Sequence, residues 1–349
     1  MKTRAIWLGA VLAVCSSAAG AANTCLVSTS KSTITLQGDC TTDASLVIPD
    51  GMTFNLNGHT VTAVDPPGGH FVGGIVQNGG ARASVTNGTL RTSGALADVC
   101  DAGADRLRGV LFDGASGAIT NLRVLDINQN NGATLSGCQE GNAIEVRNFG
   151  SSPTTVTVVI DGNIVAGYQK TGIIVNGDSD GTVTNNTVTG AGPQGFIAQN
   201  GIQIGFGATA KVKFNTVSGN AYTGNSTVSG GVIVVAGPFY GSDYSVGNQV
   251  QNNTLTGNDI GVWLSQIDAS GNPPPTQTNA KVDHNTIGNA ALTNGLPYQA
   301  GVADQGNNDK IINNAISGAG YDPATAPGAT FAVDADPSFT NRPKVHANR

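Results

Sequence analysis

The stretch Val183-Thr-Asn-Asn-Thr-Val188 decides the fold, because its spacing recurs along the chain. An apolar residue is followed three positions later by an asparagine and five positions later by a second apolar residue. The asparagines in this place are Asn163, Asn186, Asn215, Asn253, Asn285 and Asn314, and weaker copies place Gly88 or Leu122 there. The alternation of inward and outward side chains slips by one residue within each copy, which predicts a bend at the asparagine in a left-handed or bridging conformation.

A second phrase occurs in each repeat together with the first. It consists of Gly or Ala followed by two apolar residues with one position between them. Its first apolar residues are Ile75, Val110, Ile144, Ile173, Ile202, Val232, Val262 and Val302. The distance from the leading Gly to the asparagine is 14 residues after Gly172 and 24 after Gly261, so only the connections vary. A repeat of this kind is typical of a stacked array, in which the asparagines would lie about 4.8 Å apart and bond as a ladder.

The phrases Gly-Ile-Ile-Val at Gly172 and Asn-Asn-Thr-Val-Thr-Gly at Asn185 resemble those of right-handed parallel β-helix proteins of the pectate-lyase-like superfamily. The resemblance covers roughly residues 45–320. It implies an all-β, right-handed, single-stranded parallel β-helix of about nine coils with an Asn ladder.

The ends of the chain depart from the repeat. Residues 1–22 resemble a secretory signal, with Lys2 and Arg4 before a short apolar run, which predicts a secreted or periplasmic protein. Residues 23–44 are expected to form an N-terminal cap, and the β-helix domain to span 45–320. The segment 321–349 is expected to close the domain, with Phe339 capping the core and 342–349 loose. No later segment is apolar enough to predict a membrane span.

The net charge of the chain indicates which classes of binding partner are expected. Without residues 1–22 the chain keeps fifteen basic and 23 acidic residues, a net charge of −8. A nucleic-acid binder needs a basic face, so this balance argues against one, although a local basic patch stays open. The resemblance instead implies a polysaccharide as partner.

Four cysteines remain after residue 22, and an even number in an exported chain predicts disulfides. Cys100 and Cys138 lie in long loops that lead into the same strand on neighbouring coils. We therefore predict the pair Cys100–Cys138, which leaves Cys25–Cys40 to join the first strand region.

The outward positions of the Gly-led strand are where chemistry is expected. One predicted column reads Val76, Leu111, Glu145, Ile174, Gln203, Ile233, Trp263 and Ala303, and the next reads Asn78, Asp113, Arg147, Asn176, Gly205, Val235 and Ser265. We predict a catalytic set of Asp113, Glu145, Arg147 and Lys170 and substrate-binding side chains at Arg106, Arg108, Gln203, Trp263 and Tyr240. The alternatives are ordinary surface ion pairs and aromatic side chains that merely cover the sheet.

Asp113 and Glu145 lie on adjacent coils and are offset from one another by two residues along the strand. This offset predicts a backbone separation of about 8 Å, which suits the acid and base of an inverting glycosidase. Lyase-like relatives use Lys and Arg, which Lys170 and Arg147 match by type. Both readings predict that replacing Glu145 or Arg147 lowers turnover without changing melting. The resemblance allows a calcium cofactor, but no run of three acids supports one, so no metal site is predicted.

Two functions remain open from the sequence. The first is a secreted polysaccharide lyase or glycoside hydrolase that acts in a groove along the Gly-led sheet. The second is a non-catalytic surface, adhesion or carbohydrate-binding protein that uses the β-helix as a rigid rod.

Overall fold

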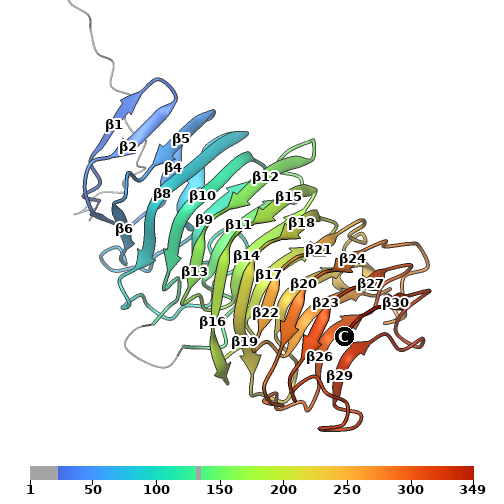
Figure 1. Cartoon of the computed structure of the whole chain (residues 1–349). Coiled ribbons are helices and arrows are strands. Elements are labelled where there is room, and N and C mark those ends of the chain that lie inside the picture. The colour runs from blue at the N-terminus through green and yellow to red at the C-terminus, as the bar shows by residue number, and fades with distance from the viewer. Residues whose placement is uncertain (1–22, 131–134) are drawn as a thin grey trace, which may run out of the picture.

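A computed structural model describes residues 23–130 and 135–349, and the predicted signal segment 1–22 lies outside the described residues. The chain winds into a parallel β-helix, in which strands of successive coils stack along one axis (Figure 1). The predicted all-β solenoid is confirmed, and its Gly-led strands form a sheet of ten. Figure 1 shows the N-terminal coils at one end of the stack and the C-terminal coils at the other.

The Gly-led sheet is built from the second sequence phrase. Its strands, in stacking order, are β4 (Leu46–Ile48), β7 (Gly74–Asn78), β9 (Arg108–Asp113), β11 (Asn142–Asn148), β14 (Thr171–Gly177), β17 (Asn200–Gly205), β20 (Gly230–Ala236), β23 (Ile260–Gln266), β26 (Gln299–Asp304) and β29 (Thr330–Asp334). A short 3₁₀ helix, η1 (Pro238–Tyr240), follows β20.

The other strands flank the asparagine bend. The pre-ladder strands are β5 (Met52–Asn55), β12 (Val156–Asp161), β15 (Ser179–Thr184), β18 (Thr209–Lys213), β21 (Gln249–Gln251), β24 (Lys281–Asp283), β27 (Lys310–Ile312) and β30 (Lys344–His346). The post-ladder strands are β3 (Cys40–Thr42), β6 (Thr60–Ala63), β13 (Ile164–Ala166), β16 (Thr187–Gln194), β19 (Thr216–Tyr222), β22 (Thr254–Thr256), β25 (Thr286–Gly288) and β28 (Ala315–Ser317). Two long strands, β8 (Arg82–Thr92) and β10 (Ser116–Leu125), run through the bend, and β1 (Val27–Ser30) pairs antiparallel with β2 (Thr33–Leu36).

The core is one narrow column of apolar side chains along the axis. Ile144, Ile173, Ile202, Val232 and Val262 pair in register on successive coils, and all are fully buried. Each coil therefore buries its apolar surface mainly against the coil above and the coil below, as in other solenoids.

The Asn ladder is confirmed. The side-chain oxygen of Asn215 accepts hydrogen bonds from the backbone N–H and the side-chain amide of Asn186, both at 2.9 Å. The same two bonds join Asn163 to Asn186, Asn253 to Asn285 and Asn285 to Asn314. The ladder thus satisfies buried backbone groups at a bend where no strand partner is available.

The bend itself lies one residue earlier than predicted. The left-handed φ angles fall on the residue before each ladder asparagine, as at Asn185 (φ 55°), Phe214 (59°) and His284 (55°). The ladder asparagine must aim its amide along the stack, so the sharp turn of the backbone falls on its neighbour.

The chain beyond Gly320 also differs from the expectation, because it adds a further coil. β29 pairs with β26. β30, which lies in the segment 342–349 that we expected to be loose, pairs with β27. Asn348 accepts hydrogen bonds from the backbone and side-chain nitrogens of Asn314 and so extends the ladder. The sequence signal was present, since Val345 and Asn348 have the spacing of the first phrase.

Both predicted disulfides are confirmed. The Cα atoms are 4.9 Å apart in Cys25–Cys40 and 5.2 Å apart in Cys100–Cys138. The second bond ties the loop before β9 to the loop before β11. The loop before β9 covers part of the Gly-led sheet.

Candidate functional site

The outer face of the Gly-led sheet carries the predicted columns of side chains. The strand register places Leu111, Glu145, Ile174, Gln203, Ile233, Trp263 and Ala303 in one line. The first coil differs from the prediction by one residue, because Gln77 and not Val76 lies opposite Leu111. Val76 is fully buried instead. At the other end Asp334 pairs with Ala303 and extends the column.

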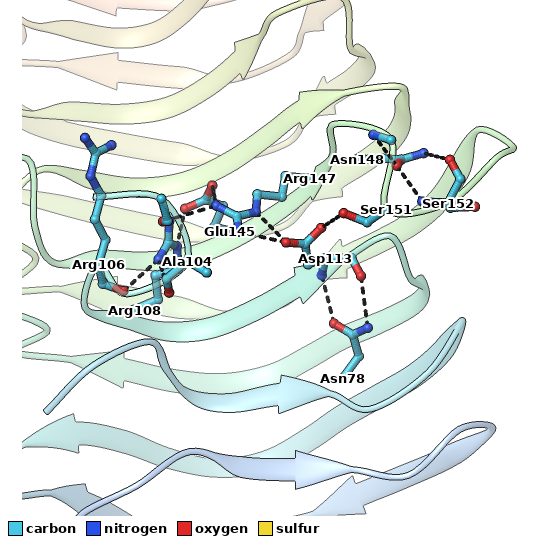
Figure 2. A network of polar contacts seen from close by, with 12 residues as sticks. Asn78, Ala104, Arg106, Arg108, Asp113, Glu145, Arg147, Asn148, Ser151 and Ser152 are labelled. Atoms are coloured by element: carbon cyan, nitrogen blue, oxygen red, sulfur yellow. Dashed lines mark hydrogen bonds and ion pairs between the residues drawn. The ribbon is translucent and has the colours of Figure 1, made fainter. Parts of the chain in front are cut away.

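Four charged side chains meet near the middle of the sheet, and we call them the central cluster: Arg108, Asp113, Glu145 and Arg147 (Figure 2). Arg147 lies directly opposite Asp113 across the strands and donates two hydrogen bonds to its carboxylate, at 2.7 and 2.9 Å. Arg108 donates from its Nε to Glu145 at 2.5 Å. Glu145 also lies 3.8 Å from Arg147, so the charges alternate in sign and balance one another.

A loop seals half of this cluster from solvent. The guanidinium of Arg108 donates to the backbone carbonyls of Gly103, Ala104 and Arg106. The same loop is anchored from below by Glu140, whose buried carboxylate accepts the N–H groups of Asp101 and Leu107. Burial raises the pKa of Glu140.

The exposures show which members a ligand could reach. The side chains of Arg108 and Glu145 are 2% and 5% exposed, whereas Asp113 is 32% exposed. Asp113 also accepts a hydrogen bond from Ser151 (Figure 2). Together with Ser152 it lines a cavity of about 370 Å³. Within the central cluster, Asp113 is the member that lines this cavity.

Lys170 does not join the central cluster. It lies just before β14, whereas Arg147 lies opposite Asn176 near the end of that strand. Six residues of strand separate the two positions, which corresponds to about 20 Å. The Lys170 ammonium donates to the carbonyl of Ala198 at 2.6 Å, and burial lowers its pKa to about 8.

The predicted substrate-binding residues are spread along the sheet and its loops. Gln203 donates to Asn176 in the middle of the face. Arg106 bonds to the carbonyl of Asp101, and its side chain points away from the central cluster in Figure 2. The hydroxyl of Tyr240 lies 2.7 Å from that of Ser265, so this ring is tied to the outer face near Trp263.

A recess lies at the C-terminal end of the same face, and we call it the terminal recess. Its volume is about 190 Å³, and its lining residues are Trp263, Tyr298, Ala303, Asp304, Gln305, Asp334 and Phe339. The small Ala303 stands between Trp263 and Asp334 in the outward column and leaves the space open. Phe339 is half exposed at this recess and does not cap the core as expected, because the added coil already covers that end.

Polar groups of the terminal recess are held in fixed positions. The hydroxyl of Tyr298 donates to Asp334 at 2.6 Å, and the indole N–H of Trp263 donates to Gln305 at 3.2 Å. Tyr298 also packs against Phe331 with ring centroids 5.6 Å apart. Sequence reasoning identified Trp263 but missed Tyr298, Gln305 and Asp334. Asp334 had a signal, because Ala332-Val333-Asp334 begins like the Gly-led phrase.

A buried pair of acids supports the terminal recess from beneath. Asp304 accepts hydrogen bonds from the N–H of Gly306 and the hydroxyl of Thr340, and Asp309 accepts from Thr278. Burial raises the pKa of Asp304, and burial together with the charge of Asp304 raises the pKa of Asp309 to about 8. The folded state therefore favours binding of a proton by this buried pair.

We expect Asp309→Asn to stabilise the protein increasingly as the pH rises. The ordinary pKa of this group is 3.8 and the folded value is about 8, so the folded state binds the extra proton and stability falls between these values. Asparagine mimics the protonated acid, and its advantage should grow by about 2 to 4 kcal/mol between about pH 5 and about pH 8. Urea unfolding at both pH values measures this, with exposed Asp105→Asn as control. A gain that is independent of pH would contradict the assignment.

Among residues 23–130 and 135–349, no group of three or more His, Cys, Asp or Glu side chains is placed to hold a metal ion. In the same part of the chain, no helix has the length and apolarity needed to cross a bilayer.

The fold and the site define a parallel β-helix protein with a charged cluster and an aromatic recess on the outer face of one sheet. No family model matches the chain, and no curated protein matches its sequence. Solved structures that resemble the chain in fold include the three described next. The Dettilon tailspike protein is 17% identical with a TM-score of 0.47, and the match covers 89% of this chain but only 62% of the tailspike chain.

The other two similar structures are named as epimerases. A double mutant of a periplasmic alginate epimerase is 13% identical with a TM-score of 0.45, over 92% of this chain and 79% of the other. The A-module of a mannuronan C-5 epimerase from Azotobacter vinelandii is 13% identical with a TM-score of 0.42, over 89% and 88% of the two chains.

Proposed function

We propose that this is a secreted polysaccharide-active protein whose ligand lies along the outer face of the Gly-led sheet. The observation that carries the proposal is the terminal recess, where aromatic side chains and a fixed carboxylate surround a small cavity on that face. Concave sites that are mostly apolar, with a few fixed polar groups, are typical of ligand binding. Two disulfides fit the oxidising compartment that a secreted protein enters.

The chemistry of the terminal recess suits one sugar unit. The faces of Trp263 and Tyr298 offer apolar surface to the C–H side of a sugar ring. Asp334 and Gln305 offer oxygen acceptors to its hydroxyl groups. The carboxylates of Asp304 and Asp334 disfavour a uronate there, so the unit that binds is neutral or carries an amine.

Catalysis within this groove is the finer part of the proposal. Asp113 and Glu145 serve as the acid–base pair of a hydrolase, or Arg147 and Lys170 serve a lyase as charge stabiliser and base. The lowered pKa of Lys170 supports a basic role for that amine. The separation of Lys170 from Arg147 favours the hydrolase, in which exposed Asp113 is the group that meets the sugar. The buried ion pair of Glu145 with Arg108 counts against a catalytic role for Glu145.

The non-catalytic alternative rests on a specific observation. Every charge of the central cluster is neutralised by another member, and half of the cluster is sealed beneath a loop. A carbohydrate-binding or adhesion protein would use such a cluster to hold the loop and would leave binding to the terminal recess.

We expect Trp263→Ala to lower affinity for the bound oligosaccharide at least tenfold, because a stacked ring contributes about 1.5 kcal/mol or more. The measurement is calorimetric titration against a panel of neutral, amino-sugar and uronate oligosaccharides. Ala303→Leu is the second variant, since it fills the recess floor while leaving Trp263 in place. Phe149→Ala removes an exposed ring elsewhere and serves as matched control.

The same panel decides between catalysis and binding. New reducing ends would indicate a hydrolase, and unsaturated products would indicate a lyase. Asp113→Asn should lower hydrolase turnover about a hundredfold or more, whereas Lys170→Ala should abolish a lyase and only weaken a hydrolase. Binding that survives both Trp263→Ala and Ala303→Leu would place the ligand elsewhere and overturn the proposal.

A further inference from the structure

Lysine is distributed unevenly over this chain. Seven lysines follow residue 22, and five of them lie on pre-ladder strands of the C-terminal half. Four of the five fall in a single column of the strand register, which we call the lysine stripe: Lys211, Lys281, Lys310 and Lys344. Gln249 occupies the one intervening rung, so the stripe extends over about 19 Å.

This arrangement is unfavourable for stability. Lys281, Lys310 and Lys344 lie directly opposite one another on adjacent strands, and like charges in that position destabilise a sheet. Lys281 has a partner in Asp283 at 2.6 Å. In the described part of the chain, no carboxylate lies within ion-pair distance of Lys211, Lys310 or Lys344, and all three are exposed.

Protection of a sheet edge does not account for the stripe. Lysine often blunts an exposed edge strand, and this reason would apply to Lys344 on β30, which pairs on one side only in the described chain. Lys281 and Lys310 lie on interior strands with partners on both sides. Edge protection therefore does not explain the charge of these two residues.

The column of the stripe continues into a depression on the same face. Beyond Lys211 the register runs through Thr182, Val159 and Ala118 to Ser84. These strands border an open trough of about 610 Å³, whose charged lining residues are Arg82, Asp180 and, at one end, Lys211. The stripe and the trough together form a continuous track along one column of the register and its neighbour.

We propose that the lysine stripe is a docking track for a linear anionic polysaccharide, one that bears carboxylate or sulfate groups along its length. A track one column wide matches a single polymer chain, whereas a lipid surface would need cations spread over an area. The rest of the molecule is strongly acidic and repels a polyanion, which confines binding to the stripe. The track lies on different strands from the terminal recess, so the two sites take different ligands and the inference does not depend on the proposed function.

The test is binding of the full chain to two probes, polygalacturonate for carboxylate and heparin for sulfate, across a range of salt. The triple variant Lys211→Gln/Lys310→Gln/Lys344→Gln should bind the preferred probe at least tenfold more weakly at low salt. The slope of log affinity against log salt should fall by about 2, since each lost cation releases about 0.7 fewer counterions from a single-stranded polyanion. Its melting temperature should be equal or higher, because like-charge repulsion is relieved.

The matched control is Lys31→Gln/Arg123→Gln, which removes two exposed cations from other parts of the surface. This control should bind each probe as the parent does, and neutral dextran should not compete. If the triple variant does not fold, the single charge reversal Lys310→Glu gives the same comparison. Binding unchanged by these substitutions, no binding of either probe by the parent, or equal affinity for duplex DNA would each overturn the proposal.

Discussion

Asn215→Leu should destabilise the protein by about 3 to 5 kcal/mol, a larger loss than a single surface hydrogen bond would cause. Asn215 lies near the middle of the ladder, and its side-chain oxygen accepts two hydrogen bonds from Asn186. Its amide donates to the carbonyl of Val183 and to Asn253. Leucine would leave both donors of Asn186 buried without an acceptor, and each such group costs about 1 to 3 kcal/mol.

Equilibrium unfolding in urea measures this loss. Thr216→Leu is the control, because it places the same side chain one residue later on the exposed side of the bend. Since each coil contacts only its neighbours, the variant should also broaden the transition as the stack loses cooperativity. Equal stability of the Asn215 and Thr216 variants would show that the ladder does not hold the coils together.

Glu145→Gln should destabilise the protein by about 3 kcal/mol, because it leaves the Arg108 guanidinium charged and almost fully buried. The sequence alone predicted no change in melting, on the ground that Glu145 points away from the core. The side chain does leave the core, but the loop over β9 and β11 encloses it again.

A double-mutant cycle separates the ion pair from the packing around it. Arg108→Met and Glu145→Leu should each be costly alone, and the double variant should recover part of the loss because no unpaired charge remains. Arg91→Met is the control, since its pair with Asp126 is about half exposed and should contribute less than about 1 kcal/mol. Additive losses in the cycle would mean that Arg108 and Glu145 act independently.

The structural cost of breaking the Arg108–Glu145 pair changes how a loss of turnover should be interpreted. Local unfolding of the loop in a Glu145 variant would also lower activity, without the loss of a catalytic group. Asp113→Asn is the cleaner probe of chemistry, because Asp113 is the most exposed acid of the central cluster. Melting data must therefore accompany every activity measured at Glu145 or Arg108.

The sequence by itself determined the coil. The spacing of apolar residues around Asn186 and after Gly172 predicted the parallel stack, the Asn ladder, the outward columns from Leu111 to Ala303 and both disulfides. These features depend on local periodicity and on the register of neighbouring coils, and both are written in the order of residues. The same phrases in weaker form marked the last coil at Val333 and Val345.

Only the tertiary structure decided what the outward side chains do. Glu145 and Arg108 are buried because a loop of variable length folds back over them, and repeat spacing contains no information about that path. The terminal recess likewise joins Trp263 to Tyr298 and Phe339, which belong to connections between strands and not to the repeat. The column of the lysine stripe was present in the sequence, because each of its lysines directly precedes the first apolar residue of the first phrase, but only the structure shows which of them are exposed and lack a carboxylate partner. The repeat specifies each coil through contacts with adjacent coils, whereas the loops that build the sites are placed by contacts far apart in the sequence.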